Sequence, residues 1–161
     1  MEKLKQFLLI LWQLPQYLLG LSLIKITKAV RRVTSGYVWY YFDRAGGFNR
    51  FFSGVSLASI ILLPYEDLTV IKHERGHSKQ SLILGWLYLP VVGIYSAVFC
   101  NLWDRRFHTK WNLYDRAYWY YKLRWTERWA DKLGGVDRDS VLCEVCRPPN
   151  SKYPAINVRS T

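Results

Sequence analysis

His73-Glu74-Arg75-Gly76-His77 is the stretch that decides how the rest of the chain is interpreted. Two histidines four residues apart lie one turn apart on the same face of a helix, so both imidazoles can bind one metal ion. Glu74 follows the first histidine and can reach a water molecule at that metal without becoming a ligand. Two of the chain's three histidines fall in this H-E-x-x-H pattern. The stretch predicts a helix that carries a zinc site with Glu74 as general base. The alternative is a surface helix with two exposed histidines.

The neighbouring residues predict where this helix begins and what precedes it. Asp67 is placed to cap a helix that starts at Leu68, and Gly85 can end or bend that helix. Upstream, residues 37–42 and 55–63 are rich in strand-forming residues, and the stretch between them contains a turn signal at Asp43 to Gly47. We expect the two runs to pair as a hairpin. The expected fold class is α+β, with a helical core and a small β-hairpin or sheet before the H-E-x-x-H helix.

A catalytic zinc ion needs three protein ligands and one open position. The remaining histidine, His108, lies in a basic and aromatic stretch, and Glu127 is the better candidate for the third ligand. Glu127 and Asp131 are four residues apart on a predicted helix that stops at Gly134-Gly135, so they share a face. Glu127 can complete a His-His-Glu site, and Asp131 can orient one imidazole. In the alternative, Glu127 pairs with a nearby Lys or Arg on a solvated face.

H-E-x-x-H followed by E-x-x-A-D resembles the gluzincin metallopeptidases related to HtpX and the CAAX prenyl-protein proteases, and the minimal single-domain gluzincins. The resemblance covers about residues 55–135. It implies a zincin-like core in which His73, His77 and Glu127 bind zinc, Glu74 is the base and Asp131 orients a ligand. The stretch from His73 to Ser81 also resembles an H-E-x-G-H-x-x-Q-S pattern of small bacterial membrane proteins.

The same resemblance implies a short sheet whose edge strand pairs with an extended substrate. Val55 to Leu63 is placed to be that strand, and the candidate pairing residues are Leu57, Ala58, Ser59, Ile60 and Ile61. A group that stabilises an oxyanion is expected as well. Its candidates are His108, Tyr118 and Tyr120.

Two long apolar stretches, Phe7 to Ile26 and Leu82 to Leu102, indicate contact with membrane lipids. Each is close to the ~20 residues that cross a bilayer, and each contains a helix-breaking proline, Pro15 or Pro90. Lys and Arg flank both stretches on both sides, so the charges favour no orientation and leave spanning, re-entrant and interfacial arrangements open. The alternative is a pair of buried helices in a soluble protein. Three irregularly spaced cysteines favour a reducing location, and we expect the cytoplasmic face of the cell membrane.

The chain divides into three expected segments. Residues 1–36 form an apolar, basic and membrane-associated helical segment, and residues 37–136 form the metallopeptidase domain. Residues 137–161 contain three prolines and little periodicity, which predicts a loosely ordered tail. Within it, Cys143 and Cys146 form a C-x-x-C pair without a partner pair, which is not enough to define a zinc or redox site.

Composition and charge leave three classes of function open. Half of the residues are hydrophobic and 17% are aromatic, which excludes a disordered chain, and the net charge of +11 calls for an anionic partner. The leading expectation is a membrane-associated zinc metallopeptidase that acts on a peptide or protein substrate. The alternatives are a non-catalytic membrane protein with a structural zinc site and a basic nucleic-acid-binding protein. The apolar stretches favour membrane lipids over nucleic acid as partner, because the aromatic and basic run Trp111 to Trp129 also suits a membrane interface.

Overall fold

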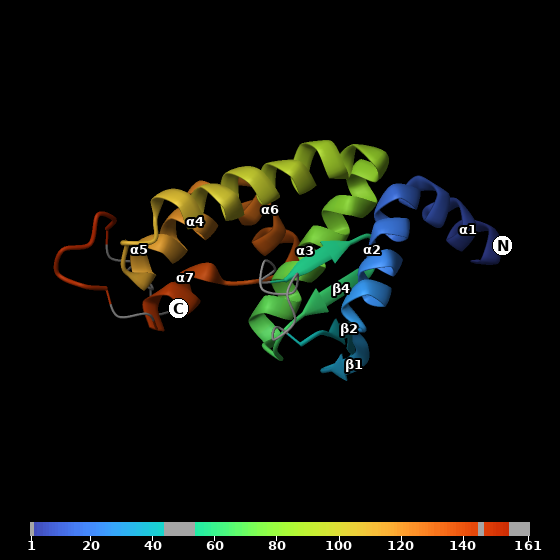
Figure 1. Cartoon of the computed structure of the whole chain (residues 1–161), viewed down its shortest axis with the longest axis horizontal. Helices are drawn as coiled ribbons and strands as arrows, with labels where there is room; N and C mark the ends of the chain where they lie inside the picture. Colours follow the sequence, from blue (N-terminus) through green and yellow to red (C-terminus); the bar gives the residue numbers. More distant parts are fainter. Residues whose placement is uncertain (1, 44–53, 145–146, 155–161) are drawn as a thin grey trace.

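The computed structural model describes residues 2–43, 54–144 and 147–154, which fold into a helical body around one small sheet (Figure 1). The expected α+β class is confirmed. In chain order the elements are α1 (Glu2–Trp12), α2 (Leu14–Thr27), β1 (Val30–Thr34), β2 (Tyr37–Tyr41), β3 (Val55–Leu57), β4 (Ile60–Leu63), α3 (Leu68–Leu84), the 3-10 turn η2 (Gly85–Leu87), the π-helical η3 (Leu89–Gly93) and η4 (Ser96–Leu102), α4 (Trp103–Phe107), α5 (Leu113–Tyr118), η5 (Trp119–Leu123), α6 (Trp125–Gly134) and α7 (Arg138–Glu144).

The sheet differs from the expected hairpin. Its strand order is β1-β2-β4-β3, and β2 pairs with β4 in parallel, so the expected antiparallel pairing of residues 37–42 with 55–63 is wrong. The antiparallel partner of β2 is β1, a segment for which the sequence predicts a helix. Ser35 and Gly36 connect them with φ angles of 49° and 81°, the geometry of a tight hairpin turn. The expected turn after Asp43 lies outside the described residues.

The run Val55 to Leu63 is itself a hairpin, which corrects the expected single edge strand. Ala58 and Ser59 form its turn, and Ala58 has a φ of 53°. Ile60 and Ile61 belong to β4, which has a neighbouring strand on each side. Ile60 and Ile61 are paired with Leu57 and Ser56 of β3, so they do not form the expected free edge. Leu57, at the end of β3, is the one predicted pairing residue that lies on an edge strand.

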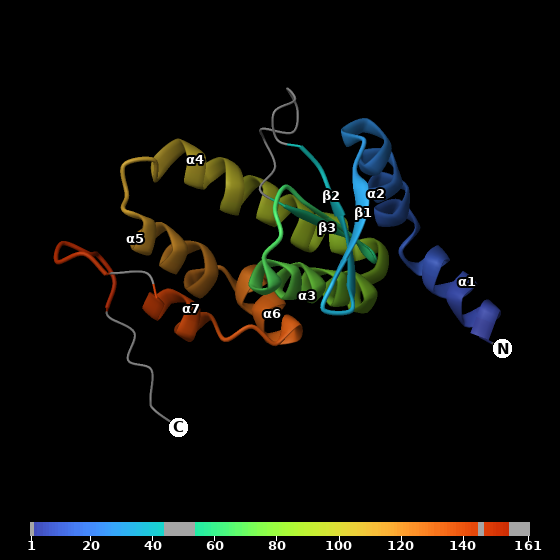
Figure 2. The same cartoon turned by 90° about the horizontal axis from the view of Figure 1, so that it is seen from below.

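Helices cover both faces of the sheet. On one face Trp39, Ile61 and Leu63 pack against Ile71 of α3. On the other face Phe42, Ile60 and Leu62 pack against residues of α2. Every residue of β4 is buried, as expected of a strand with both faces covered. Figure 2 shows the strands between α2 and α3. The hydrophobic core thus fixes the N-terminal part of α3, where the H-E-x-x-H stretch begins.

Both apolar stretches bend sharply. Among the described residues no single helix is both long and apolar enough to cross a bilayer. Two pairs of helices meet those criteria together, with bends of 83° between Glu2–Trp12 and Leu14–Thr27 and of 119° between Leu68–Leu87 and Leu89–Phe99. Pro15 lies in the first turn of α2, which confirms the expected break there. Gly85 ends α3 with a φ of 54°, a conformation that glycine tolerates.

The expected loose tail is wrong for residues 138–144. They form α7, and Arg138 at its start donates two hydrogen bonds to Asp131, of 2.9 and 2.6 Å. Further along, Pro154 accepts a 2.6 Å hydrogen bond from the hydroxyl of Tyr114. A buried ion pair holds this segment against the body, and sequence periodicity does not reveal such a contact. Cys146, and with it the C-x-x-C pair, lies outside the described residues.

α3 and α6 approach each other more closely than side chains normally allow. A Cβ placed on Gly76 would lie 1.9 Å from the carbonyl oxygen of Ala130, and one on Gly134 would lie 2.1 Å from that of Lys72. Further along, the amide of Gln80 donates a 2.8 Å hydrogen bond to the carbonyl of Thr126. From one of these contacts to the next, the residue number rises along α3 and falls along α6, so the two helices are antiparallel. Backbone contact at Gly76 sets their separation.

Replacement of Gly76 by alanine tests this contact. The added methyl group would force α3 away from α6, so we expect the free energy of unfolding to fall by about 3 kcal/mol, equivalent to about 10 °C in Tm. Thermal unfolding followed by circular dichroism measures the change. Gly93→Ala is the matched control, because its Cβ would meet no atom closer than 3.5 Å. Equal Tm values for the two variants would show that the helices do not need the close approach.

Candidate metal centre

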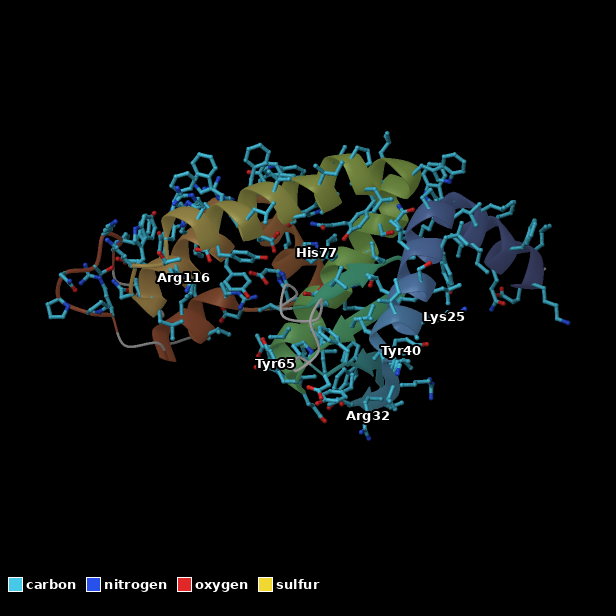
Figure 3. All side chains as sticks on the ribbon, viewed as in Figure 1. Lys25, Arg32, Tyr40, Tyr65, His77 and Arg116 are labelled. Atoms are coloured by element: carbon cyan, nitrogen blue, oxygen red, sulfur yellow. The ribbon has the colours of Figure 1, made fainter. Side chains whose placement is uncertain are left out.

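The H-E-x-x-H stretch lies in the middle of α3, as predicted. Asp67 caps this helix: its carboxylate accepts hydrogen bonds of 2.7 and 3.1 Å from the backbone N–H groups of Thr69 and Val70. His73 and His77 are both buried and project from the same face of α3. Their rings lie 4.8 Å apart, edge to face. Figure 3 shows His77 in the interior of the molecule, not at its outline.

Glu127 of α6 meets both histidines. Its Oε2 atom lies 3.2 Å from Nε2 of His73 and 3.3 Å from Nε2 of His77, and the side chain is fully buried. One donor atom from each of the three residues lies within 4.8 Å of the other two. Two ligands of a tetrahedral zinc ion, each about 2.0–2.1 Å from the metal, are about 3.3 Å apart. His73, His77 and Glu127 therefore form a group that could hold a metal ion, and Glu127 is not on a solvated face.

Each imidazole is oriented through its other nitrogen. Nδ1 of His73 lies 2.7 Å from Oδ1 of Asp131, as predicted, and Nδ1 of His77 lies 2.7 Å from Oε1 of Gln80. A carboxylate or amide oxygen only accepts hydrogen bonds, so each Nδ1 carries the proton. Each Nε2 can then offer its lone pair to a metal ion as a neutral imidazole. Both tautomers that metal binding requires are thus set by the protein.

Gln80 is a residue of the site that the sequence does not predict. The 2.8 Å hydrogen bond from its amide nitrogen to the Thr126 carbonyl turns its oxygen toward His77. Its position three residues after the second histidine, on the same helix face, is a signal that could have identified it. The other unforeseen residue is Arg138, whose two hydrogen bonds fix the carboxylate of Asp131. No local spacing relates Arg138 to α3.

Contacts from α7, η5 and η4 also hold the side chains of the site in place. The guanidinium of Arg138 lies 3.6 Å from the ring of Tyr121, and that ring stands edge to face with His73 at 5.3 Å. On the other side, Ser96 of η4 donates a short hydrogen bond to Oε1 of Glu127. Thr126 donates a second one, of 3.3 Å, to the same oxygen. Oε2 of Glu127 is left to face the two histidines.

Glu74 lies beside the histidines, toward the sheet. Its Oε1 atom is 3.1 Å from the position that a Cβ on Gly54 would take, just before β3. Burial raises the pKa of the Glu74 carboxyl, against the lowering effect of His77 and His73. Within the described part of the chain, no hydrogen bond restrains this carboxylate. A carboxylate with a raised pKa and free acceptor oxygens suits the role of general base.

The charges of the site are strongly coupled. Burial lowers the pKa of His73, but hydrogen bonds to Asp131 and Glu127 outweigh it and raise the pKa to about 9. The pKa of His77 is raised too: burial lowers it, and the charge of Glu127 more than compensates. Burial raises the pKa of Glu127, yet the two histidines bring it well below its usual value. Before metal binding, the His73 imidazole therefore holds a proton at neutral pH that a metal ion would have to displace.

Of the other predicted participants, His108 and Tyr118 lie in contacts outside the metal site, and the edge of β3 is covered. His108 stacks on Trp111 at 3.8 Å, and Tyr118 stacks on Tyr153 at 4.7 Å. His108 is therefore not the third ligand, and no described contact brings either residue to the site. The outer edge of β3 is occupied as well, because the hydroxyl of Tyr88 donates a 3.0 Å hydrogen bond to the Ser56 carbonyl. An extended peptide could pair with β3 only in place of that contact.

No model of a known protein family, no curated protein and no solved structure matches this chain.

Gln80→Ala tests whether the ligands are oriented as described. Loss of the Gln80 oxygen leaves Nδ1 of His77 without its partner, and we expect zinc affinity to fall about 10–100-fold. Competition with a chromophoric chelator measures the affinity. Gln6→Ala is the control, because Gln6 lies on α1 and is exposed. A Gln80→Ala protein that binds zinc as tightly as the wild type would contradict the proposed orientation.

The raised pKa values predict the pH dependence of metal binding. Both imidazoles have pKa values above the ordinary 6.5, that of His73 at about 9, so protons compete with metal at neutral pH. Apparent zinc affinity should rise between pH 6 and pH 9, by up to about tenfold per pH unit for each imidazole that loses a proton. Isothermal titration in two buffers of different ionisation enthalpy measures the affinity and the protons released. A flat profile with no proton release would refute this charge state.

Proposed function

We propose that the protein is a membrane-associated zinc metallopeptidase that hydrolyses peptide bonds. The buried His73, His77 and Glu127, with one nitrogen of each histidine already occupied by an orienting partner, carry the proposal. The carboxylate of Glu74, which lies beside them, supplies the second part of the machinery. A structural zinc site would need no such base. The likeness of H-E-x-x-H and E-x-x-A-D to the gluzincins supports the same activity.

The roles of the residues follow from their positions. His73, His77 and Glu127 would hold the metal, and Asp131 and Gln80 keep the two imidazoles in the binding tautomer. Bound zinc supplies Lewis-acid chemistry, since it polarises a carbonyl oxygen and lowers the pKa of water to about 7. Glu74 accepts the proton of the attacking water and then donates it to the amine that leaves. The raised pKa of Glu74 favours the first transfer, because a carboxylate with a higher pKa is a stronger base.

Exposed apolar side chains support the membrane part of the proposal. They cover α1, the end of α3 and the run from η3 to α4, which forms the upper edge of the molecule in Figure 1. Aromatic rings project outward from that edge in Figure 3. An apolar surface of this extent is unusual on a soluble monomer and suits insertion among lipids. The exposed residues include Leu4, Phe7, Leu8, Leu11, Trp12, Leu82, Ile83, Trp86, Leu87, Ile94, Phe99, Leu102, Trp103 and Phe107.

The decisive experiment compares wild type with Glu74→Gln. Both proteins, purified in detergent, should contain one zinc ion per chain, because Glu74 is not a ligand. Cleavage of a peptide library, followed by mass spectrometry, should fall about 10²–10⁴-fold in the variant. Glu66→Gln is the matched control, since Glu66 is exposed and bonds only to Thr34 among the described residues. Stoichiometric zinc with equal cleavage by wild type and Glu74→Gln would overturn the peptidase proposal and leave the metal site intact.

A further inference from the structure

A cavity of about 350 Å³ lies on the side of α3 that faces away from the metal centre. Its walls come from α1, α2, the turn between β3 and β4, and α3. Arg75 and Lys79 of α3 line it, and each is two residues from a histidine of the site, or about 200° around the helix. The cavity therefore lies on a different face of α3 from the two histidines.

The lining combines positive charge with apolar surface. Arg75 and Lys79 are four residues apart and lie on one helix face, while Leu9, Ile10 and Leu82 supply apolar walls. No acidic side chain lines the cavity among the residues that the structure describes. Within the same residues Arg75 makes no ion pair, so its five N–H donors are available to a ligand. Lys79 donates one 2.7 Å hydrogen bond to the Leu133 carbonyl of α6 and keeps two further donors.

Hydrogen bonds fix the walls relative to one another. The indole of Trp12 donates to the Leu82 carbonyl and that of Trp86 donates to the Leu11 carbonyl, both at 2.8 Å. On the opposite side, the hydroxyls of Tyr17 and Ser59 lie 3.2 Å apart and join α2 to the turn. The cavity is thus a built feature that precedes any ligand.

We propose that this cavity binds the phosphate headgroup of an anionic membrane phospholipid. The phosphate lies between Arg75 and Lys79, which donate to its oxygens, and the start of an acyl chain lies along Leu9, Ile10 and Leu82. Arginine and lysine are the residues that bind phosphate most strongly, through charge-assisted hydrogen bonds. Leu9, Ile10 and Leu82 are 45%, 39% and 44% exposed, so the apolar wall continues onto the lipid-facing surface. A soluble anion would use the charges and leave that wall unfilled.

The inference does not depend on hydrolysis, since lipid binding can be measured on the inactive Glu74→Gln protein. Full-length protein in a neutral detergent is incubated with phosphatidylglycerol or phosphatidylcholine of matched chain length, and bound lipid is counted by native mass spectrometry. We expect one phosphatidylglycerol per chain and at least tenfold weaker binding of phosphatidylcholine. Inorganic phosphate at the same concentration as the lipid should displace less than a tenth of it.

Two pairs of variants distinguish lipid binding in the cavity from general electrostatic attraction to the protein surface. Arg75→Gln should weaken phosphatidylglycerol binding at least fivefold, while Arg128→Gln, which removes an exposed charge from α6, should change it less than twofold. Leu9→Trp fills the cavity and should abolish binding. Leu8→Trp, at a neighbouring exposed position that does not line the cavity, should preserve it. Zinc content checks that α3 is intact in each variant.

Three results would overturn the proposal. Equal losses in Arg75→Gln and Arg128→Gln would show that only net charge matters. Full binding by Leu9→Trp would place the lipid elsewhere. Complete displacement by inorganic phosphate would show a simple anion site without a lipid component. Each result can occur whether or not the protein cleaves peptides, so failure here is distinguishable from failure of the proposed function.

Discussion

The close contact of α3 with α6 is the constraint on which the site depends. Gly76 lies between the two histidines of α3, and Ala130 lies between Glu127 and Asp131 of α6. Backbone contact at that point, where any added Cβ would meet the Ala130 carbonyl, brings both acidic side chains within reach of the imidazoles. A larger residue would move the helices apart and lengthen every ligand-to-ligand distance at once. The glycine inside H-E-x-x-H therefore determines the geometry of the site although it offers no ligand.

The acidic and imidazole groups are held by elements from distant parts of the chain. Asp131 is fixed by α7, Glu127 by η4 and His77 by the Gln80 amide, which in turn bonds to the start of α6. Each partner satisfies a buried polar atom that would otherwise be costly to desolvate. Because the orienting groups are buried and mutually bonded, the ligands keep their places before a metal ion arrives. Such pre-organisation lowers the cost of binding and favours a defined coordination geometry.

The two bent apolar pairs meet at their corners. Trp12 and Trp86 each donate an indole hydrogen bond to a backbone carbonyl of the other pair, and the amide of Gln16 donates to the Gly85 carbonyl. These bonds join the N-terminal helices to the helix that carries the histidines. α3 thus carries the two metal-site histidines on one face, lines the basic cavity on another and has exposed apolar residues at its end. In the two proposals taken together, the end of α3 faces lipid. One side of the helix faces a lipid headgroup, and the other side faces the substrate.

The sequence by itself determined the parts that depend on spacing within one element. Histidines four residues apart must share a helix face, and Asp67, Pro15 and Gly135 mark element ends through local backbone preferences, so these predictions hold. Glu127 could be predicted as third ligand because it shares a helix face with Asp131, and the gluzincin resemblance implies the same role. Tertiary structure decided the strand pairing. β2 has β1 as its antiparallel partner and β4 as its parallel partner, and packing of the sheet between α2 and α3 places β4 there. Tertiary structure also decided the roles of residues such as Arg138, because contacts between distant segments leave no periodic signal in the chain.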